Sequence, residues 1–380
     1  MPRTEDAYGR PRAPEERGMG FSCGIIGVPN AGKTSLFNAI SGAHAASSNY
    51  PFCTIEPNKA TVAVPDPTLA GLAEIVRSPR TTPTALELVD VAGLVEDAHK
   101  GEGLGNQFLA HVRDIDILIH LVRLFRDTNV AREAPLDPVR DLRIVVDELR
   151  FKDMETVETR LEKEKRRGHA TKDAVETALE GLKEKLGAHE LLLPSQFSPE
   201  ELAMGRELCL LSCKPYFVVA NVDEADIAAP EKDPRYGELA ACLAPHGVPL
   251  LAISSHIEEE IHGLEPEERA VFMQEYGLAA TGLERIIATG YTLLDLVTFY
   301  TFNENELRAW TLRRGEHIIT AAGKIHTDMA KGFIRADVVH AGDFLACGSF
   351  AHARTQGKMV TAGRDYIVRD GDIILIKFKA

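Results

Sequence analysis

The sequence predicts an α/β fold with an open, largely parallel sheet, and three observations predict it. Short apolar runs that suit buried parallel strands recur at residues 21–26, 85–90, 115–122, 215–224 and 250–255. A glycine-rich turn and an amphipathic helix directly follow the first run. Polar residues end several of the later runs, at the edge where open α/β sheets bind ligands.

The turn after the first run matches a phosphate-binding loop, the P-loop. Residues 27–34 fit G-x-x-x-x-G-K-[ST], in which glycines let backbone N–H groups face phosphate oxygens. The next helix presents its positive N-terminus to the same charge. Lys33 would reach the β- and γ-phosphates, and the Thr34 hydroxyl would hold Mg²⁺. The residues expected to contact a nucleotide here are Asn30, Ala31, Gly32, Lys33, Thr34 and Ser35.

Two later segments predict nucleotide-sensing switches. Thr54 lies in a proline-punctuated loop; alone it is a plain turn residue, but its position predicts an Mg²⁺ ligand when the γ-phosphate is present. Asp90 and Gly93 form D-x-x-G at the end of a strand. Asp90 would hold Mg²⁺ through water, and the Gly93 N–H would sense the γ-phosphate. The alternative for Asp90 is a capping residue in an ordinary turn.

Residues 128–204 have the pattern of a helical hairpin. Apolar residues follow 3-4 spacing in 154–161 and 4-3-4 spacing in 175–186, with a break at Gly168. The other positions are almost all Lys and Glu, which indicates a solvated face first and a partner-binding surface second. The predicted division is a disordered extension at 1–20, a nucleotide-binding domain at 21–127 and 205–282, the inserted coiled-coil hairpin at 128–204, and a tail domain at 295–378.

The tail predicts a separate small unit. Residues 310–312 and 316–319 suggest a hairpin, 321–333 a helix, and 365–378 a second hairpin over the turn at 369–372. From 295 onward the chain holds 12 Lys/Arg and 10 Asp/Glu, whereas the whole chain carries a net charge of −14. The net negative charge of the chain argues against a protein that coats nucleic acid nonspecifically, but it does not exclude a basic face on the tail.

Composition indicates a cytosolic protein without membrane segments. The 380 residues contain no apolar run near the roughly 18 residues that a membrane span needs. The first 20 residues lack the apolar core of a signal peptide and have too many acidic residues for a transit peptide. Six scattered cysteines without metal-ligand spacing indicate reduced thiols.

In this order, the motifs resemble the G1–G5 set of translation-factor-class GTPases and, more closely, the YchF/Obg-like ATPase family. The resemblance rests on 49–58 (NYPFCTIEPN), 90–106 (DVAGLVEDAHKGEGLGN), 221–224 and 322–337 (AGKIHTDMAKGFIRAD). It implies a G-domain-like P-loop NTPase with a C-terminal β-grasp module, the TGS domain. It also implies a cytoplasmic, monomeric protein that binds ribosomes and modulates translation or stress responses, with RNA contacts through the hairpin and the TGS domain.

The resemblance implies ATP as the substrate. Guanine-specific proteins carry N-K-x-D, whose aspartate accepts hydrogen bonds from guanine N1–H and the 2-amino group. Here the sequence is N-x-x-E, and a carboxylate one methylene longer no longer suits guanine. Asn221, Val222, Glu224 and Ser255 would form the base pocket. The alternatives are a degenerate guanine site, a GTPase assembly or translation factor on the same scaffold, and a nucleotide-gated binding module in which hydrolysis is incidental.

The catalytic group is not evident from the sequence. Leu94 stands where Ras-like proteins place the water-orienting glutamine, so slow hydrolysis is expected. Arg132 lies near the position where relatives carry a histidine; it could stabilise phosphate charge, although a plain surface arginine is the alternative. Asn30 recurs in relatives that recruit K⁺, which makes K⁺ a candidate cofactor beside Mg²⁺.

Overall fold

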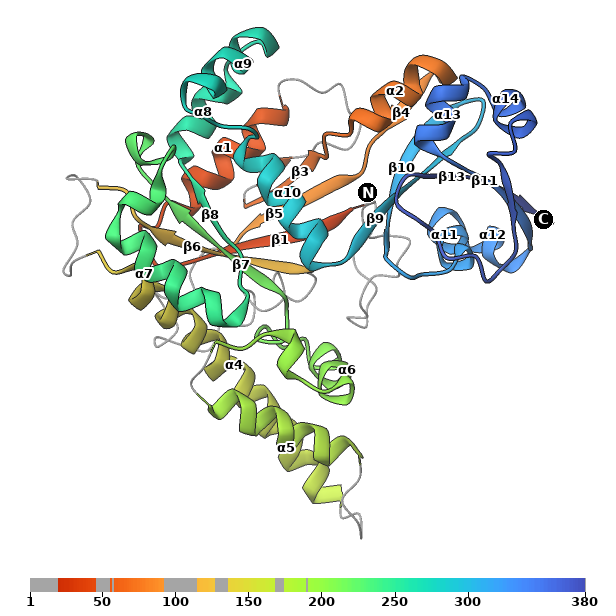
Figure 1. The fold of residues 1–380 in the computed structure, drawn as a ribbon. Helices are drawn as coiled ribbons and strands as arrows, with labels where there is room; N and C mark the ends of the chain where they lie inside the picture. Colours follow the sequence, from red (N-terminus) through yellow and green to blue (C-terminus); the bar gives the residue numbers. More distant parts are fainter. Residues whose placement is uncertain are drawn as a thin grey trace, which may run out of the picture.

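The computed structural model describes residues 20–45, 55–56, 58–91, 115–126, 136–167, 174–188 and 191–379. The described part contains two sheets and a projecting group of helices (Figure 1). Most of the predicted extension, residues 1–19, lies outside the described residues. Among the described helices, none is long and apolar enough to cross a membrane.

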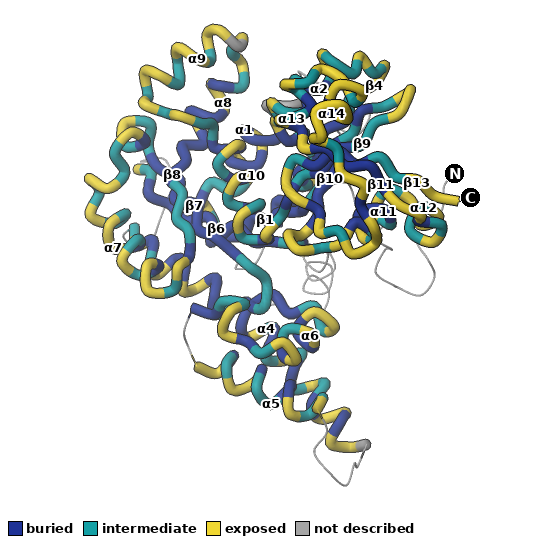
Figure 2. The backbone as a smooth tube through the Cα atoms, turned by 45° about the vertical axis from the view of Figure 1, so that its right-hand side comes forward, coloured by how far each residue is buried: buried dark blue, intermediate teal, exposed yellow. Residues whose placement is uncertain are grey.

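The first sheet carries the P-loop and confirms the predicted parallel arrangement. Its strand order is β2-β3-β5-β1-β6-β7-β8. β1 pairs in parallel with β5 and β6, and β3 runs antiparallel to β5. β1, β6 and β7 are buried at every residue, because helices cover both faces of the sheet (Figure 2). The strands are β1 (Phe21–Ile26), β2 (Ile55–Glu56), β3 (Lys59–Ala63), β5 (Ala85–Asp90), β6 (Ile117–Arg123), β7 (Tyr216–Asn221) and β8 (Leu250–Ile253).

Helices flank this sheet and form one hydrophobic core with it. Leu36, Ile40 and Phe217 are among the side chains that this core buries almost completely. The helices are α1 (Lys33–Ala45), α7 (Pro234–Leu243), α8 (Ser255–His262), α9 (Pro266–Glu275) and α10 (Gly282–Leu293), with short 3-10 turns η2 (Glu224–Asp226), η3 (Pro230–Lys232) and η4 (Ala244–His246).

The inserted helices form the predicted hairpin. In Figure 1 they extend below the sheet, away from the tail. Val157, Leu179 and Leu182 are fully buried in a separate small core, as the 3-4 spacing predicted. The turn at Gly168 lies outside the described residues. The elements are α4 (Pro138–Arg167), α5 (Ala174–Gly187), η1 (Pro194–Gln196) and α6 (Pro199–Glu207).

A buried carboxylate fixes the return from this hairpin to the sheet. Asp153 of α4 accepts hydrogen bonds from the backbone N–H groups of Leu211 (3.0 Å) and Ser212 (2.6 Å). Burial raises the pKa of Asp153 to about 6, although these two donors oppose the shift. The hairpin is therefore tied at its base through a polar group that has little contact with water.

The second sheet belongs to the tail but includes one strand from the first part of the chain. Its order is β12-β11-β13-β9-β10-β4. β4 pairs in parallel with β10, and α2, just before β4, contacts β10 and α13. The elements are α2 (Pro67–Val76), β4 (Arg80–Thr82), β9 (Leu296–Phe302), β10 (Glu306–Arg313), α11 (Ile318–Ile325), α12 (Thr327–Lys331), β11 (Phe333–His340), α13 (Ala341–Cys347), α14 (Phe350–Thr355), β12 (Val360–Ala362) and β13 (Asp372–Phe378).

Within the tail, the predicted hairpin over 310–319 is wrong. β10 pairs antiparallel with β9, which precedes it, and the chain turns at Gly315 with a φ of 86°. Residues from Ile318 onward form a helix, because Ile318, Ala321 and Ala322 place one apolar face in the core. The predicted helix 321–333 is likewise two helices, separated by the extended residue His326.

The second predicted hairpin, over 365–378, is also wrong. The turn at 369–371 leads into β13, but residues 365–368 contribute only one isolated bridge, between His317 and Ile367. β13 instead pairs with β11 and β9, strands that lie far from it in sequence. Pairing between strands that are distant in sequence has no local signal. The turn alone therefore suggested a hairpin that the structure does not contain.

Candidate nucleotide-binding site

The P-loop curves between β1 and α1 as the motif predicts. Asn30 and Gly32 both adopt positive φ, 63° and 91°, which turns the backbone sharply before α1 begins at Lys33. The Lys33 ammonium group donates to the carbonyls of Gly27 (3.0 Å) and Val28 (3.1 Å) and so lies across the loop. This arrangement puts a cation and a helix N-terminus at one point, which is a site for phosphate.

Close packing explains the glycine at the start of the loop. A Cβ on Gly27 would lie 2.4 Å from the carbonyl oxygen of Leu121 in β6. The loop can therefore lie against β6 only with glycine at this position. Gly32 is equally confined, because its Cβ would lie 2.3 Å from the side-chain nitrogen of Asn221.

A hydroxyl and a carboxylate meet beside the loop. Thr34 Oγ1 donates to Asp90 Oδ2 at 2.9 Å, and Asp90 is only 5% exposed. The other carboxylate oxygen, Asp90 Oδ1, is buried without a hydrogen-bond partner among the described residues. A buried carboxylate oxygen next to a hydroxyl is the donor set that Mg²⁺ prefers, so these residues fit the ion.

Several predicted site residues lie outside the described part of the chain. Thr54, Gly93, Leu94 and Arg132 belong to this group. Their predicted roles in metal binding, γ-phosphate sensing and hydrolysis therefore stay predictions.

Asn221 at the end of β7 joins the P-loop to the predicted base pocket. Its side-chain nitrogen donates to the carbonyl of Ala31 at 3.2 Å. Its side-chain oxygen accepts from the backbone N–H (3.2 Å) and the hydroxyl (3.1 Å) of Ser255. Val222 is also buried and donates its N–H to the carbonyl of Ile253 in β8. Asn221, Val222 and Ser255, which the sequence predicted as parts of one base pocket, lie close together. However, both the nitrogen and the oxygen of the Asn221 side chain already bond to protein groups.

Glu224, the acid predicted to contact the base, lies at the start of η2. Its carboxylate lies 2.8 Å from Nδ1 of His256, and 43% of its side chain is exposed. His256 belongs to the first turn of α8 and lies 3.6 Å from Glu260 as well. Sequence reasoning missed His256; its only signal is its position directly after Ser255.

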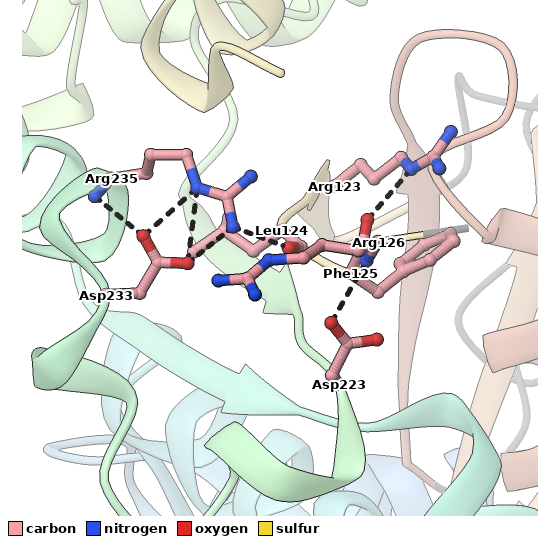
Figure 3. A network of polar contacts seen from close by, with 7 residues as sticks. All are labelled: Arg123, Leu124, Phe125, Arg126, Asp223, Asp233 and Arg235. Carbon is pink, nitrogen blue, oxygen red and sulfur yellow. Dashed lines mark hydrogen bonds and ion pairs between the residues drawn. The ribbon is translucent and has the colours of Figure 1, made fainter. Parts of the chain in front are cut away.

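Sequence reasoning also missed a polar network that joins the segment after β6 to Asp223 and Arg235 (Figure 3). The backbone N–H groups of Leu124 and Phe125 both donate to the carbonyl of Asn221, at 2.8 and 3.0 Å. The N–H of Arg126 donates to Asp223 Oδ2 at 3.0 Å. The segment after β6, which leads toward the hairpin, is therefore bonded residue by residue to the N-x-x-E segment.

Two arginines hold this segment from either side. The Arg123 guanidinium lies 4.4 Å above the ring of Phe125 and donates through Nε to its carbonyl. Arg235 donates to Leu124 O at 3.1 Å and to Asp233, and the Arg235 hydrogen bond lowers the pKa of that carboxyl. The Phe125 ring approaches the P-loop, since a Cβ on Gly32 would lie 3.6 Å from it.

The fold and site define a P-loop nucleotide-binding protein of the GTPase class with an additional C-terminal sheet. Residues 22–164 match a family model described as "50S ribosome-binding GTPase". Residues 296–379 match the model YchF-GTPase_C, described as a protein of unknown function.

Similar proteins cover almost the whole chain. The "Ribosome-binding ATPase YchF" of Bacillus subtilis is 42% identical over 95% of this chain and 100% of its own length. The protein of that name from Haemophilus influenzae is 39% identical, over 95% and 99%. The solved Schizosaccharomyces pombe YchF GTPase superposes with a TM-score of 0.82 at 33% identity, over 97% and 99%. The chain belongs to the YchF family.

Proposed function

We propose that this protein is a Mg²⁺-dependent nucleoside triphosphate hydrolase that works as a slow switch and prefers ATP. The observation that carries the proposal is the contact between Thr34 and Asp90 at 2.9 Å, directly beside the P-loop lysine. A P-loop alone binds phosphate, whereas a P-loop with a metal-binding hydroxyl and carboxylate at its rim can support hydrolysis. Relatives named as ATPases over nearly the full length agree with this proposal.

The predicted site residues would divide the work of binding the triphosphate. Lys33 would exchange its two carbonyl partners for phosphate oxygens, and the P-loop N–H groups from Asn30 to Ser35 would surround them. Thr34 would hold Mg²⁺ directly and Asp90 through water, and Thr54 would join them. When bound, the ion neutralises charge that develops on the phosphates. Gly93 is the proposed γ-phosphate sensor.

Turnover is proposed to be slow because Leu94 cannot orient a water molecule. The group that takes the role of the missing glutamine is not assigned, and Arg132 is one candidate. K⁺ near Asn30 is another, since a monovalent cation could supply the positive charge that an arginine finger supplies elsewhere.

The choice of ATP rests on Glu224 and its neighbours. The printed names of similar proteins are divided, since the bacterial relatives are called ATPases and the solved relative a GTPase. A GTPase on the same scaffold is therefore the second candidate. Glu224 lies 2.8 Å from His256, so part of its acceptor capacity is used within the protein. A guanine base would compete for that capacity, whereas adenine would not.

Competition between labelled ATP and unlabelled GTP tests the choice of base. GTP should displace ATP only at concentrations roughly tenfold to a hundredfold higher, because a guanine N–H donor buried in the complex without a paired acceptor would cost about 1–3 kcal/mol. Val222→Lys with Glu224→Asp should move the preference toward GTP, and Ser255 is the next position to change. Displacement by GTP at equal or lower concentration would replace the ATPase proposal with the GTPase one.

We propose the ribosome as the partner, and therefore the cytoplasm as the location. This proposal rests on the names of the relatives and on the matched family description. The hairpin of α4 and α5 and the tail sheet are the proposed RNA-contacting surfaces of a monomer. Sedimentation with purified ribosomes, with ATP and without nucleotide, tests it; Lys33→Ala should lose the nucleotide dependence. Equal single-turnover rates with and without ribosomes would favour the nucleotide-gated binding module.

A further inference from the structure

A cavity of about 460 Å³ lies where the first part of the chain meets the tail. Its walls come from the loop between β3 and α2, from α10 and β9, from the start of α13, and from the turn before β13. In Figure 1, α2, α13 and β9 converge on the tail side of the first sheet. The volume is within the range of small-molecule sites, about 300–1,000 Å³.

The lining carries two carboxylates, those of Asp66 and Asp370. Its imidazole is that of His340, whose Nδ1 accepts from the Gly342 N–H at 3.1 Å, and no lysine or arginine is among the described residues that line the cavity. Asp66 accepts from Tyr300 Oη at 2.9 Å and, as the N-cap of α2, from the Leu69 N–H at 2.9 Å. Asp370 Oδ1 accepts from the Thr298 N–H at 2.8 Å. A carboxylate offers about four lone-pair sites, so both keep capacity to accept from a ligand.

Hydroxyl groups extend this acceptor surface. Tyr291, Thr84 and Thr298 also line the cavity, and Tyr291 Oη lies 3.1 Å from Thr84 Oγ1 and 3.3 Å from Thr298 Oγ1. Burial raises the pKa of the Tyr291 hydroxyl, and the negative charges of Asp66 and Asp370 raise it further. The two carboxylates of the lining favour a cationic ligand over phosphates and other anions.

Part of the wall is apolar. Val64, Ile287 and Leu345 contribute aliphatic side chains to it. α2 and α13 are in contact here, since a Cβ on Gly71 would lie only 3.3 Å from Leu345. The hydrogen bond from Tyr300 to Asp66 also fixes β9 to the N-cap of α2. These contacts hold α2, α13 and β9 together around the cavity.

We propose that this cavity binds an aliphatic polyamine such as spermidine. Its ammonium groups, which only donate hydrogen bonds, would pair with Asp66 and Asp370, and its methylene chain would lie along the apolar wall. A bare metal ion fits less well, because the described residues contain no group of three potential metal-ligating acids, histidines or cysteines. The inference goes beyond the nucleotide-dependent function and does not depend on it.

Calorimetry with spermidine and the full chain tests the proposal. The titration should be carried out in about 150 mM KCl, because at low salt a chain of net charge −14 would attract any polycation nonspecifically. Asp370→Asn is the main variant: it removes the charge, and its amide oxygen can still accept from Thr298. Asp365→Asn is the matched control, because Asp365 is an exposed acid of the same tail that does not line the cavity.

The expected result is saturable binding at one site, weakened at least tenfold by Asp370→Asn and within twofold of the parent for Asp365→Asn. Asp66→Asn should weaken binding similarly, and circular dichroism checks that its α2 cap is intact; if that variant unfolds, Asp370→Asn decides alone. Lys33→Ala should leave spermidine binding unchanged, which separates this site from the nucleotide site. Absence of saturable binding, or equal effects of Asp370→Asn and Asp365→Asn, would overturn the proposal.

Discussion

The side-chain nitrogen of Asn221 donates a hydrogen bond to the carbonyl of Ala31 at 3.2 Å, across 190 positions of sequence. Because the oxygen of the same amide accepts from Ser255, one buried side chain connects the P-loop with the ends of β7 and β8. The shape of the phosphate loop and the shape of the base pocket therefore depend on each other.

Asn221→Ala should weaken binding of both ATP and GTP by roughly tenfold to a hundredfold. The substitution leaves the Ala31 carbonyl and the Ser255 N–H without buried partners, a loss of about 1–3 kcal/mol. Calorimetry with each nucleotide and Mg²⁺ measures it. The control is Ser255→Ala, which removes only the hydroxyl contact and should have a smaller effect. A loss of ATP affinity alone would mean that Asn221 acts on the base and not on the loop.

Lys33→Ala should abolish nucleotide binding or nearly so, because the triphosphate loses its compensating charge. Thr34→Ala should instead weaken only the Mg²⁺-dependent part of the affinity. Titrations in Mg²⁺ and in EDTA separate the two effects. Unchanged ATP affinity in Lys33→Ala would contradict the assignment of the P-loop.

The sequence predicted those parts of the site whose signals are local. The P-loop, the strand that ends at Asp90 and the N-x-x-E segment each carry their chemistry within a few residues. The motifs predicted Thr34 and Asp90 as Mg²⁺ ligands, with Asp90 at the edge of the sheet where open α/β sheets bind ligands. The hydrogen bond between them is seen only in the structure. The pairing of His256 with Glu224 and the network around Arg235 depend on packing between distant elements, and no motif indicated them.

The same distinction explains the errors in the fold. The helical hairpin was predictable because its apolar spacing repeats over many turns. In the tail, short apolar runs on either side of turns looked like hairpins, although β13 pairs with β9 and β11 instead. The pairing of β4 with β10 joins residues more than 200 positions apart, and three residues are too few to predict it.

Basal hydrolysis should be slow, on the order of 10⁻⁴ to 10⁻² s⁻¹, the range of switch proteins without an assisting group. The reason is Leu94, which replaces a water-orienting glutamine with an apolar side chain. Phosphate release under single-turnover conditions, in matched KCl and NaCl buffers, measures the rate and the use of K⁺ together. Equal rates in the two salts would exclude K⁺ as a cofactor, and a fast rate would indicate a catalytic group that the sequence did not reveal.

The stability of the protein should depend on two buried groups with opposite pH responses. Burial lowers the pKa of His120 to about 3 from an ordinary value of 6.5, so its contribution is complete above pH 6.5 and is lost as the pH falls toward 3. Asp153, with its pKa raised to about 6, contributes stability that is complete below pH 3.8 and is lost as the pH rises through 6. Each response has a limiting slope of about 1.4 kcal/mol per pH unit.

Between pH 4 and 6 the contributions of His120 and Asp153 to stability change with pH in opposite directions. Substituting one of the two residues should therefore reveal the contribution of the other. His120→Phe, which keeps a ring beside Tyr216, should lose less stability than the parent when the pH falls from 6.5 to 4.5. Asp153→Asn should lose more, because the opposing contribution of the acid is gone. Urea unfolding at the two pH values measures both changes, with His246→Phe as the control for replacing a less buried histidine. Parallel pH profiles for the parent and His120→Phe would show that His120 does not become protonated on unfolding in this range.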